Sequence, residues 1–327
     1  MIIISQSPAP TLSLIREADG LFFFAVAEAA PADQAPAPAP TPAPAAPQKE
    51  TFAKDKNGAV RIKADVAGMV IENRWLSGAY RAVETDMLKD PVTGKYEIPV
   101  KTPNLVIRGV KIEEAFRDGI RLRHADGLLI ENFEIRHGAH KNTGEDLPEG
   151  IAITRAHDFL IRNGVVSGFQ MEPTYDAAGK PKYINGDGIA TEADVTGRIV
   201  NVTSTDNSDG GFDLKGDVVV DNCTALRNSR GFRFWKLDPK FFPNKTERRA
   251  GTITTDSTTW LSSGAEIVID KLVVVGSGEI DLLTVEGGAK ATIKAVDLSG
   301  FTGKVRSLVR ANGSGNTINW PAGFKAP

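Results

Sequence analysis

Short segments that alternate apolar and polar residues recur along most of the chain. One family reads apolar-x-apolar-x-Asn/Gly-x-x-apolar, and its copies begin at Met69, Leu105, Leu128, Phe159, Arg198, Val218, Ile267 and Ala291. A period of two is typical of a β-strand with one buried face. No segment is long enough to enclose a core alone, so the pattern indicates strands stacked on other copies. Asn at the same register predicts a ladder of amide hydrogen bonds between copies.

A second family alternates with the first and carries a glycine followed by apolar-x-apolar. Its glycines are Gly119, Gly150, Gly188, Gly211 and Gly231. The shortest interval between them, about 20 residues, suits a three-sided coil. We therefore predict an all-β fold, a right-handed parallel β-helix solenoid of roughly nine or ten coils over residues 51–327. No amphipathic helical pattern separates the strands, which argues against a barrel or a doubly wound sheet.

The N-terminal part of the chain has a different composition. Residues 31–50 are rich in proline and alanine, which favour extended polyproline II and predict a semi-rigid linker. Before it, the apolar segment 1–30 contains two β-prone runs, residues 11–16 and 21–27, separated by a stretch with Asp19-Gly20. This pattern predicts a hairpin that docks on a partner. An atypical export signal and a misassigned start codon are the alternatives.

Composition and charge exclude several classes of protein. The formal net charge of −2 argues against a nucleic-acid-binding protein. No apolar run approaches the roughly 18 residues that span a membrane. Cys223 is the single cysteine, which excludes an internal disulfide framework and a cysteine zinc site.

The second family also predicts which side chains face outward. If the apolar residue after each glycine points inward, the next residue points out, which gives the column Arg121, Ala152, Ala190, Asp213 and Arg233. Long inserts at 136–148, 168–185 and 236–250 would wall this face. A walled polar face is a groove suited to polysaccharide, and a charge ladder without function is the plainer alternative. The substrate-binding candidates are Arg121, Arg123, Glu192, Arg230 and Trp235.

Three segments on successive copies carry the densest chemistry, residues 185–188 (NGDG), 206–213 (DNSDGGFD) and 228–233 (NSRGFR). They resemble the family-9 pectate lyases, parallel β-helix enzymes whose aspartates bind calcium and whose lysine removes a proton. The resemblance implies that Asp187, Asp209 and Asp213 are calcium ligands. It places Arg233 at the position of the base, with Lys215 as a substitute. The chain departs from the family at Gly210, where a second aspartate is usual, and at Arg233 itself.

The implied chemistry is β-elimination of a uronic-acid polymer. A hard cation neutralises the sugar carboxylate, and a cationic side chain of lowered pKa then removes the adjacent proton. Arginine is hard to deprotonate, so a degenerate site and another carbohydrate chemistry stay open beside a working lyase. In the degenerate case the aspartates only form turns. Hydrolysis ranks lower, because polygalacturonase-like β-helices carry later Gly-His-Gly and Arg-Ile-Lys segments, and no histidine follows His157.

Two functions therefore compete. The first is an extracellular protein that binds or cleaves an acidic polysaccharide, with calcium as the implied cofactor. The second is a non-catalytic structural or receptor-binding β-helix of a phage tailspike, virion or surface appendage, docked through residues 1–30. The acidic cluster favours the first, whereas the linker and hairpin favour the second. Both place the protein outside the cell, at a cell surface or on a virion.

Overall fold

The computed structural model describes residues 12–16, 22–26, 47–54, 58–144, 146–180 and 184–325. The chain divides into two units, Met1–Ala46 and Pro47–Pro327. In the first, β1 (Leu12–Arg16) pairs antiparallel with β2 (Phe22–Val26), as the hairpin pattern predicts. Most of the predicted linker lies outside the described residues. The second unit has its first strand at β3 (Lys49–Thr51), slightly before the boundary expected near Glu50.

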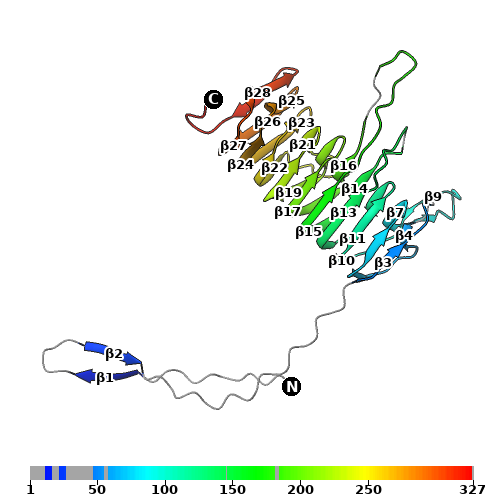
Figure 1. Ribbon diagram of the computed structural model, residues 1–327, viewed down its shortest axis with the longest axis horizontal. Coiled ribbons are helices and arrows are strands. Elements are labelled where there is room, and N and C mark those ends of the chain that lie inside the picture. Colours follow the sequence, from blue (N-terminus) through cyan, green and yellow to red (C-terminus); the bar gives the residue numbers. More distant parts are fainter. Residues whose placement is uncertain are drawn as a thin grey trace. The chain divides into compact units, whose positions relative to one another are not determined.

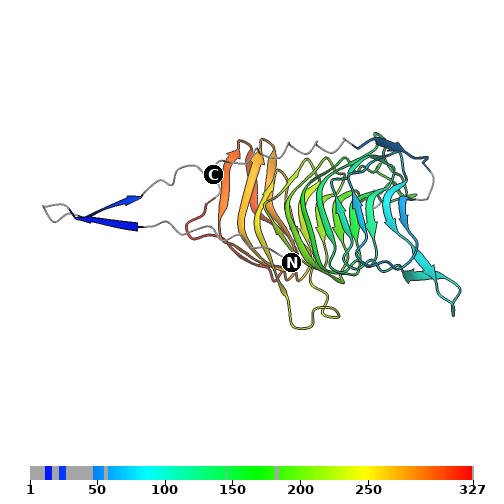
Figure 2. The ribbon, with the colours of Figure 1, turned by 90° about the horizontal axis from the view of Figure 1, so that it is seen from below.

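The second unit is a right-handed parallel β-helix, in which parallel strands stack coil upon coil (Figures 1 and 2). Sheet 1 consists of β3, β5 (Val70–Glu72), β6 (Trp75–Ser77), β10 (Val106–Arg108), β11 (Lys111–Ala115), β13 (Leu129–His137), β15 (Ala156–Ser167), β17 (Val195–Thr205), β19 (Asp217–Asp221), β20 (Cys223–Leu226), β22 (Glu247–Thr255), β24 (Glu266–Gly276), β26 (Lys290–Ile293), β27 (Val296–Phe301) and β29 (Thr317–Asn319).

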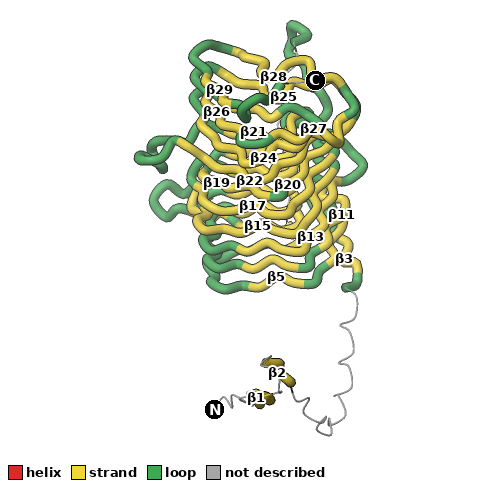
Figure 3. The backbone as a smooth tube through the Cα atoms, turned by 90° about the vertical axis from the view of Figure 1, so that its left-hand side faces the viewer, coloured by secondary structure: helices red, strands yellow, loops and turns green. Residues whose placement is uncertain are grey.

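Sheet 2 forms a second wall of the solenoid (Figure 3). It consists of β4 (Gly58–Ile62), β7 (Arg81–Thr85), β12 (Asp118–Leu122), β14 (Glu149–Ile153), β16 (Asp187–Thr191), β18 (Gly210–Leu214), β21 (Arg230–Phe234), β23 (Thr259–Leu261), β25 (Glu279–Glu286) and β28 (Lys304–Asn312). Its ten strands in the described chain agree with the predicted number of coils. A small antiparallel pair, β8 (Met87–Lys89) and β9 (Tyr96–Pro99), projects from an early coil. Helices that could cross a bilayer do not occur in the described ranges.

The core is one apolar column that runs through the coils. In sheet 2 the inward residues after the glycines are fully buried and lie in register, as the alternation predicts: Ile120, Ile151, Ile189, Phe212 and Phe232. The last two rings stack with centroids 4.8 Å apart and planes 3° from parallel. That distance matches the spacing between paired strands, so aromatic stacking continues the backbone stacking into the core.

The repeated glycines are required by close approach. A Cβ on Gly211 would lie 2.7 Å from the carbonyl oxygen of Gly231 and 2.8 Å from the Cβ of Ala225 in sheet 1. A Cβ on Gly188 would likewise lie 2.8 Å from the carbonyl oxygen of Gly211. No side chain fits where the two sheets converge, which explains why the glycine recurs at one place in the five strands from β12 to β21.

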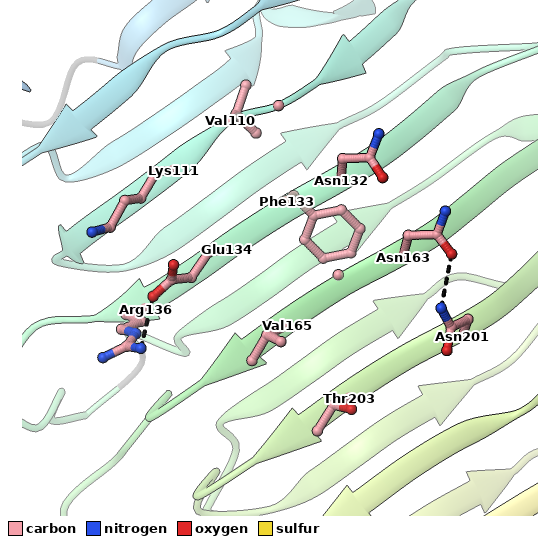
Figure 4. A pocket seen from close by; sticks show the side chains of 12 residues that line it. Val110, Lys111, Asn132, Phe133, Glu134, Arg136, Asn163, Val165, Asn201 and Thr203 are labelled. Atoms are coloured by element: carbon pink, nitrogen blue, oxygen red, sulfur yellow. Dashed lines mark hydrogen bonds and ion pairs between the residues drawn. The ribbon is translucent and has the colours of Figure 1, made fainter. Parts of the chain in front are cut away.

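Asparagines form the predicted ladder at the bend of sheet 1. Asn163, Asn201 and Asn222 have φ values of 56°, 54° and 49°, a left-handed conformation that asparagine tolerates better than most residues. The Nδ2 of Asn201 donates to Oδ1 of Asn163 at 2.9 Å (Figure 4), and the Nδ2 of Asn222 donates to Oδ1 of Asn201 at 3.2 Å. The ladder therefore fixes the bend on three successive coils.

Candidate functional site on the outer face of sheet 2

The outward side of sheet 2, which we call the site face, carries columns of residues in strict register. The predicted column is confirmed and extends further than the sequence indicated: Arg121, Ala152, Ala190, Asp213, Arg233, Trp260, Thr284 and Arg310. A second column stands at the strand entries: Arg81, Asp118, Glu149 and Asp187. All candidate residues of the central coils therefore share one face.

Long loops flank the site face at both edges. The described residues 138–144, 146–148, 168–180 and 184–186 precede β14 and β16, so they lie at the edge where strands enter sheet 2. Residues 235–246 follow β21 and lie at the opposite edge. The predicted limits of the inserts were slightly wrong, because residues 136 and 137 continue β13 and residues 247–250 belong to β22. These strands extend further because they still pair with the coils beside them.

Three carboxyl groups stand directly above one another in the entry column. Asp118 and Asp187 are 0% and 1% exposed, whereas the side chain of Glu149 between them keeps 17% of its exposure. Burial, together with the neighbouring charge of Asp118, raises the pKa of Glu149 to about 7. Burial and the charge of Asp213 also raise the pKa of Asp187. Near neutral pH the column therefore holds protons that exposed carboxyl groups would have released.

The three predicted calcium ligands already interact with protein donors. Asp187 Oδ1 accepts from the backbone N–H of Gly210 at 2.7 Å, and Asp213 Oδ1 accepts from the indole N–H of Trp235. Asp209 forms an ion pair with Arg230. Calcium takes six to eight oxygen ligands, and in the described ranges no three His, Cys, Asp or Glu side chains are arranged to hold a metal. As they stand, these three carboxyl groups do not form a calcium site. Calcium binding is implied by the resemblance alone and stays a prediction.

Gly210 explains the departure from the lyase motif in physical terms. A Cβ at this position would lie 2.7 Å from Oδ1 of Asp187. The missing side chain lets the Gly210 N–H reach that carboxyl oxygen directly. A backbone donor therefore stands where the resemblance would place a second acidic ligand.

Arg233, at the predicted base position, lies between two indole rings. Its Cζ is 3.9 Å from the ring centroid of Trp235 and 5.4 Å from that of Trp260. The residue is only 9% exposed, and its Nε and Nη1 are buried without a hydrogen-bond partner among the described residues. Arginine stays protonated in proteins, so this geometry suits anion binding better than proton abstraction.

The other predicted residues divide into two groups. Lys215 bonds to both carboxylate oxygens of Glu192 at 3.0 Å and lies 5.8 Å from the ring of Trp235, within the central cluster. Arg121 lies three strands away from β18 and pairs with Glu149 at 2.9 Å. Arg123 follows β12, and its guanidinium donates to the carbonyl of Thr85. The structure therefore joins Glu192, Arg230 and Trp235 to the acidic cluster but leaves Arg121 and Arg123 several coils away.

Trp260 is the main residue that sequence reasoning missed. It belongs to β23, whose segment has neither the glycine nor the acid of the second family. The only signal was a short alternation, Thr259-Trp260-Leu261, that follows Phe232 by roughly one coil length. Its indole contacts both Arg230, at 4.2 Å, and Arg233, so it completes the cluster.

A cavity of about 850 Å³ lies at the bend of sheet 1, away from the site face (Figure 4). None of the predicted site residues lines it. Of its charged residues, Glu134 and Arg136 pair with each other at 2.7 Å, and Lys111 pairs with Glu113 at 2.8 Å. Phe133 is buried over Gly164. The bend of the sheet accounts for its size, and we therefore assign the site to sheet 2.

Comparison with known proteins supports the fold. A family model described as a right handed beta helix region matches residues 98–246, which include β12 to β21 of the site face. None of the curated proteins compared with the chain matches it. Similarity to right-handed β-helix proteins is therefore shown for the central coils. The closer resemblance to family-9 pectate lyases stays a prediction.

Proposed function

We propose that this protein binds an acidic polysaccharide on the site face, outside the cell. The observation that carries the proposal is Arg233, an almost fully buried guanidinium between two indole rings, whose Nε and Nη1 have no hydrogen-bond partner in the part of the chain that the structure describes. Uronic-acid sugars match this environment in both respects. Their carboxylates accept charge-assisted hydrogen bonds from arginine, and their apolar ring faces pack against indoles.

The charge balance of the cluster favours an anionic ligand over a neutral one. The raised pKa values of Asp187 and Glu149 reduce the negative charge that would repel a uronate. Asp209 is paired with Arg230. Asp213, in register with Arg233, accepts from the indole of Trp235, and burial raises its pKa. Arg233 can therefore attract a further anion. The flanking loops at both edges of sheet 2 would keep an extended chain in place.

A docked structural role is the second candidate, and the β1–β2 hairpin favours it. A two-stranded hairpin is marginal alone in water and gains stability from a partner surface. In this function residues 1–30 attach the protein to a larger assembly of a virion or cell surface. The two functions are compatible, because the hairpin and the site face lie in separate units.

Titration of the full chain with oligogalacturonates, oligoalginates and a neutral oligosaccharide tests the main proposal. Tryptophan fluorescence and calorimetry measure affinity. We expect Arg233→Gln to weaken binding of the acidic ligands at least tenfold, because a hydrogen bond to a charged group is worth that much. Trp235→Ala should also weaken binding, because the sugar ring loses an indole to pack against. Arg162→Gln, on the outside of sheet 1, is the matched control. Equal affinity of Arg233→Gln and Arg162→Gln would refute the assignment.

The same titrations can detect cleavage. Ultraviolet absorbance of unsaturated uronates reports β-elimination, and parallel samples with calcium and with a chelator separate metal-dependent from metal-independent turnover. Binding without product identifies a non-catalytic binder. Product that requires calcium would restore the lyase assignment implied by the resemblance.

A further inference from the structure

A cavity of about 410 Å³ opens on the site face beyond Trp260, toward the C-terminal coils. Its lining comes from the start of β21, from the loop before β23 and from strands β23, β25 and β28. It includes Arg230, Trp260, Thr284, Arg306 and Arg310. None of the sequence-predicted residues except Arg230 belongs to it. Arg230 borders both this cavity and the cluster around Arg233, so the two are continuous.

The cavity wall is rigid and offers both apolar and hydroxyl surface. The indole N–H of Trp260 donates to Oε1 of Glu286 at 3.2 Å, which orients the ring. The guanidinium of Arg230 lies 4.2 Å from the centroid of that ring. Beside it, the hydroxyls of Thr258 and Thr284 are 3.0 Å apart. An aromatic plane next to paired hydroxyls suits a sugar ring.

Most charged groups around the cavity are engaged by other groups: Arg230 pairs with Asp209, and the carboxylate of Asp256 accepts from the backbone N–H of Arg227 at 2.9 Å. Asp281 is buried and is engaged by Arg306 and by the hydroxyl of Ser307, and these contacts lower its pKa. Glu279 pairs with Lys304 at 3.1 Å. Arg310 forms no hydrogen bond or ion pair with any residue that the structure describes. Its guanidinium is therefore free to bind an anionic group.

We infer that this cavity is a second subsite for an acidic group of the same polysaccharide, an inference that rests on the proposed function. Arg233, Trp260, Thr284 and Arg310 follow one another in one register column. Three strand spacings therefore separate the two arginines, about 14 Å along the solenoid axis. A linear polyuronate that lies along the axis can present one carboxylate to each arginine, with further sugar residues between the two. Its affinity accordingly increases once the chain is long enough to reach Arg310.

The test compares Arg310→Gln with Arg162→Gln, the control on the outside of sheet 1, whose side chain pairs with Glu131 and does not line the cavity. Both are titrated with oligogalacturonates of increasing length. We expect Arg310→Gln to lose about tenfold in affinity for long oligomers, the effect of one charge-assisted hydrogen bond, and to keep wild-type affinity for the shortest. Arg310→Lys, which retains the charge, should recover part of the loss.

The outcomes separate this inference from the proposed function. If Arg233→Gln weakens binding at all lengths while Arg310→Gln matches Arg162→Gln at all lengths, the second subsite is refuted and the main site stands. If the wild type binds no acidic oligomer of any length, both are refuted. An equal loss in Arg310→Gln for short and long oligomers would refute the axial placement of the chain.

Discussion

Substitution of Glu149 by glutamine tests whether the stacked carboxyl groups of the site face hold protons. Glu149 lies between two buried acids, and its pKa is raised to about 7 from 4.5, chiefly by burial. Glutamine has nearly the same shape and is neutral at every pH. The variant therefore resembles the wild type when Glu149 is protonated and differs from it when Glu149 is charged.

The sign and size of the effect follow from proton linkage. Because the folded-state pKa lies above the unfolded value, the folded protein binds more protons between pH 4.5 and 7. The stabilisation from protonated Glu149 is complete below pH 4.5 and disappears as the pH rises through 7. At about 1.4 kcal/mol per pKa unit, the shift corresponds to a loss of about 3 kcal/mol. Glutamine should avoid this loss.

Urea unfolding followed by tryptophan fluorescence measures the difference between two pH values. Relative to the wild type, Glu149→Gln should gain about 2–3 kcal/mol of stability at pH 8 compared with pH 5. Glu72→Gln, on the outer side of sheet 1, should show no such pH-dependent gain. A Glu149→Gln variant that loses stability equally at both pH values would refute the reasoning, because the Arg121–Glu149 ion pair would then outweigh desolvation.

Three further predictions follow from the same geometry. Gly211→Ala should lower the free energy of unfolding, measured by urea titration, by about 1–3 kcal/mol because the added Cβ overpacks the contact. Gly278→Ala is the control and should leave the free energy of unfolding unchanged, because its Cβ would meet no atom within 4 Å. Burial lowers the pKa of His137 to about 4 from 6.5, so the wild type should lose up to about 3 kcal/mol as the pH falls through that range, and His137→Phe should lose less. A chelator should leave the affinity for oligogalacturonate unchanged; a marked loss would instead support calcium.

The fold was predictable because each coil meets the same steric requirement. Gly188 and Gly211 mark places where the neighbouring carbonyl leaves no room for a side chain, and Phe212 and Phe232 alternate with outward polar residues. These constraints act within a few residues, so they produce a short repeated pattern in the sequence, a glycine followed by alternating apolar and polar residues. The column that contains Asp213 and Arg233 followed from the same alternation.

The side-chain contacts of the site were not predictable from this repeated pattern. The pairing of Asp209 with Arg230 and of Asp213 with Trp235 joins side chains from different coils, and it depends on rotamers that strand periodicity does not determine. Trp260 was missed because its strand lacks the glycine that marks the other copies. The resemblance to lyases singled out acids that the fold brings close together, and protein donors engage the carboxyl oxygens that it assigns to calcium. That assignment stays a prediction.

The repeated glycines of sheet 2, such as Gly188 and Gly211, affect how such a site can change. Each glycine allows its strand to lie close against the next coil along the solenoid axis, whatever the length of the loop that precedes it. Loops at the strand entries can therefore lengthen, shorten or be exchanged while the stacked body keeps its registration. The loops that wall the groove can therefore be exchanged while the stacked strands stay the same. Recognition of a new polymer would require new loops but no new fold.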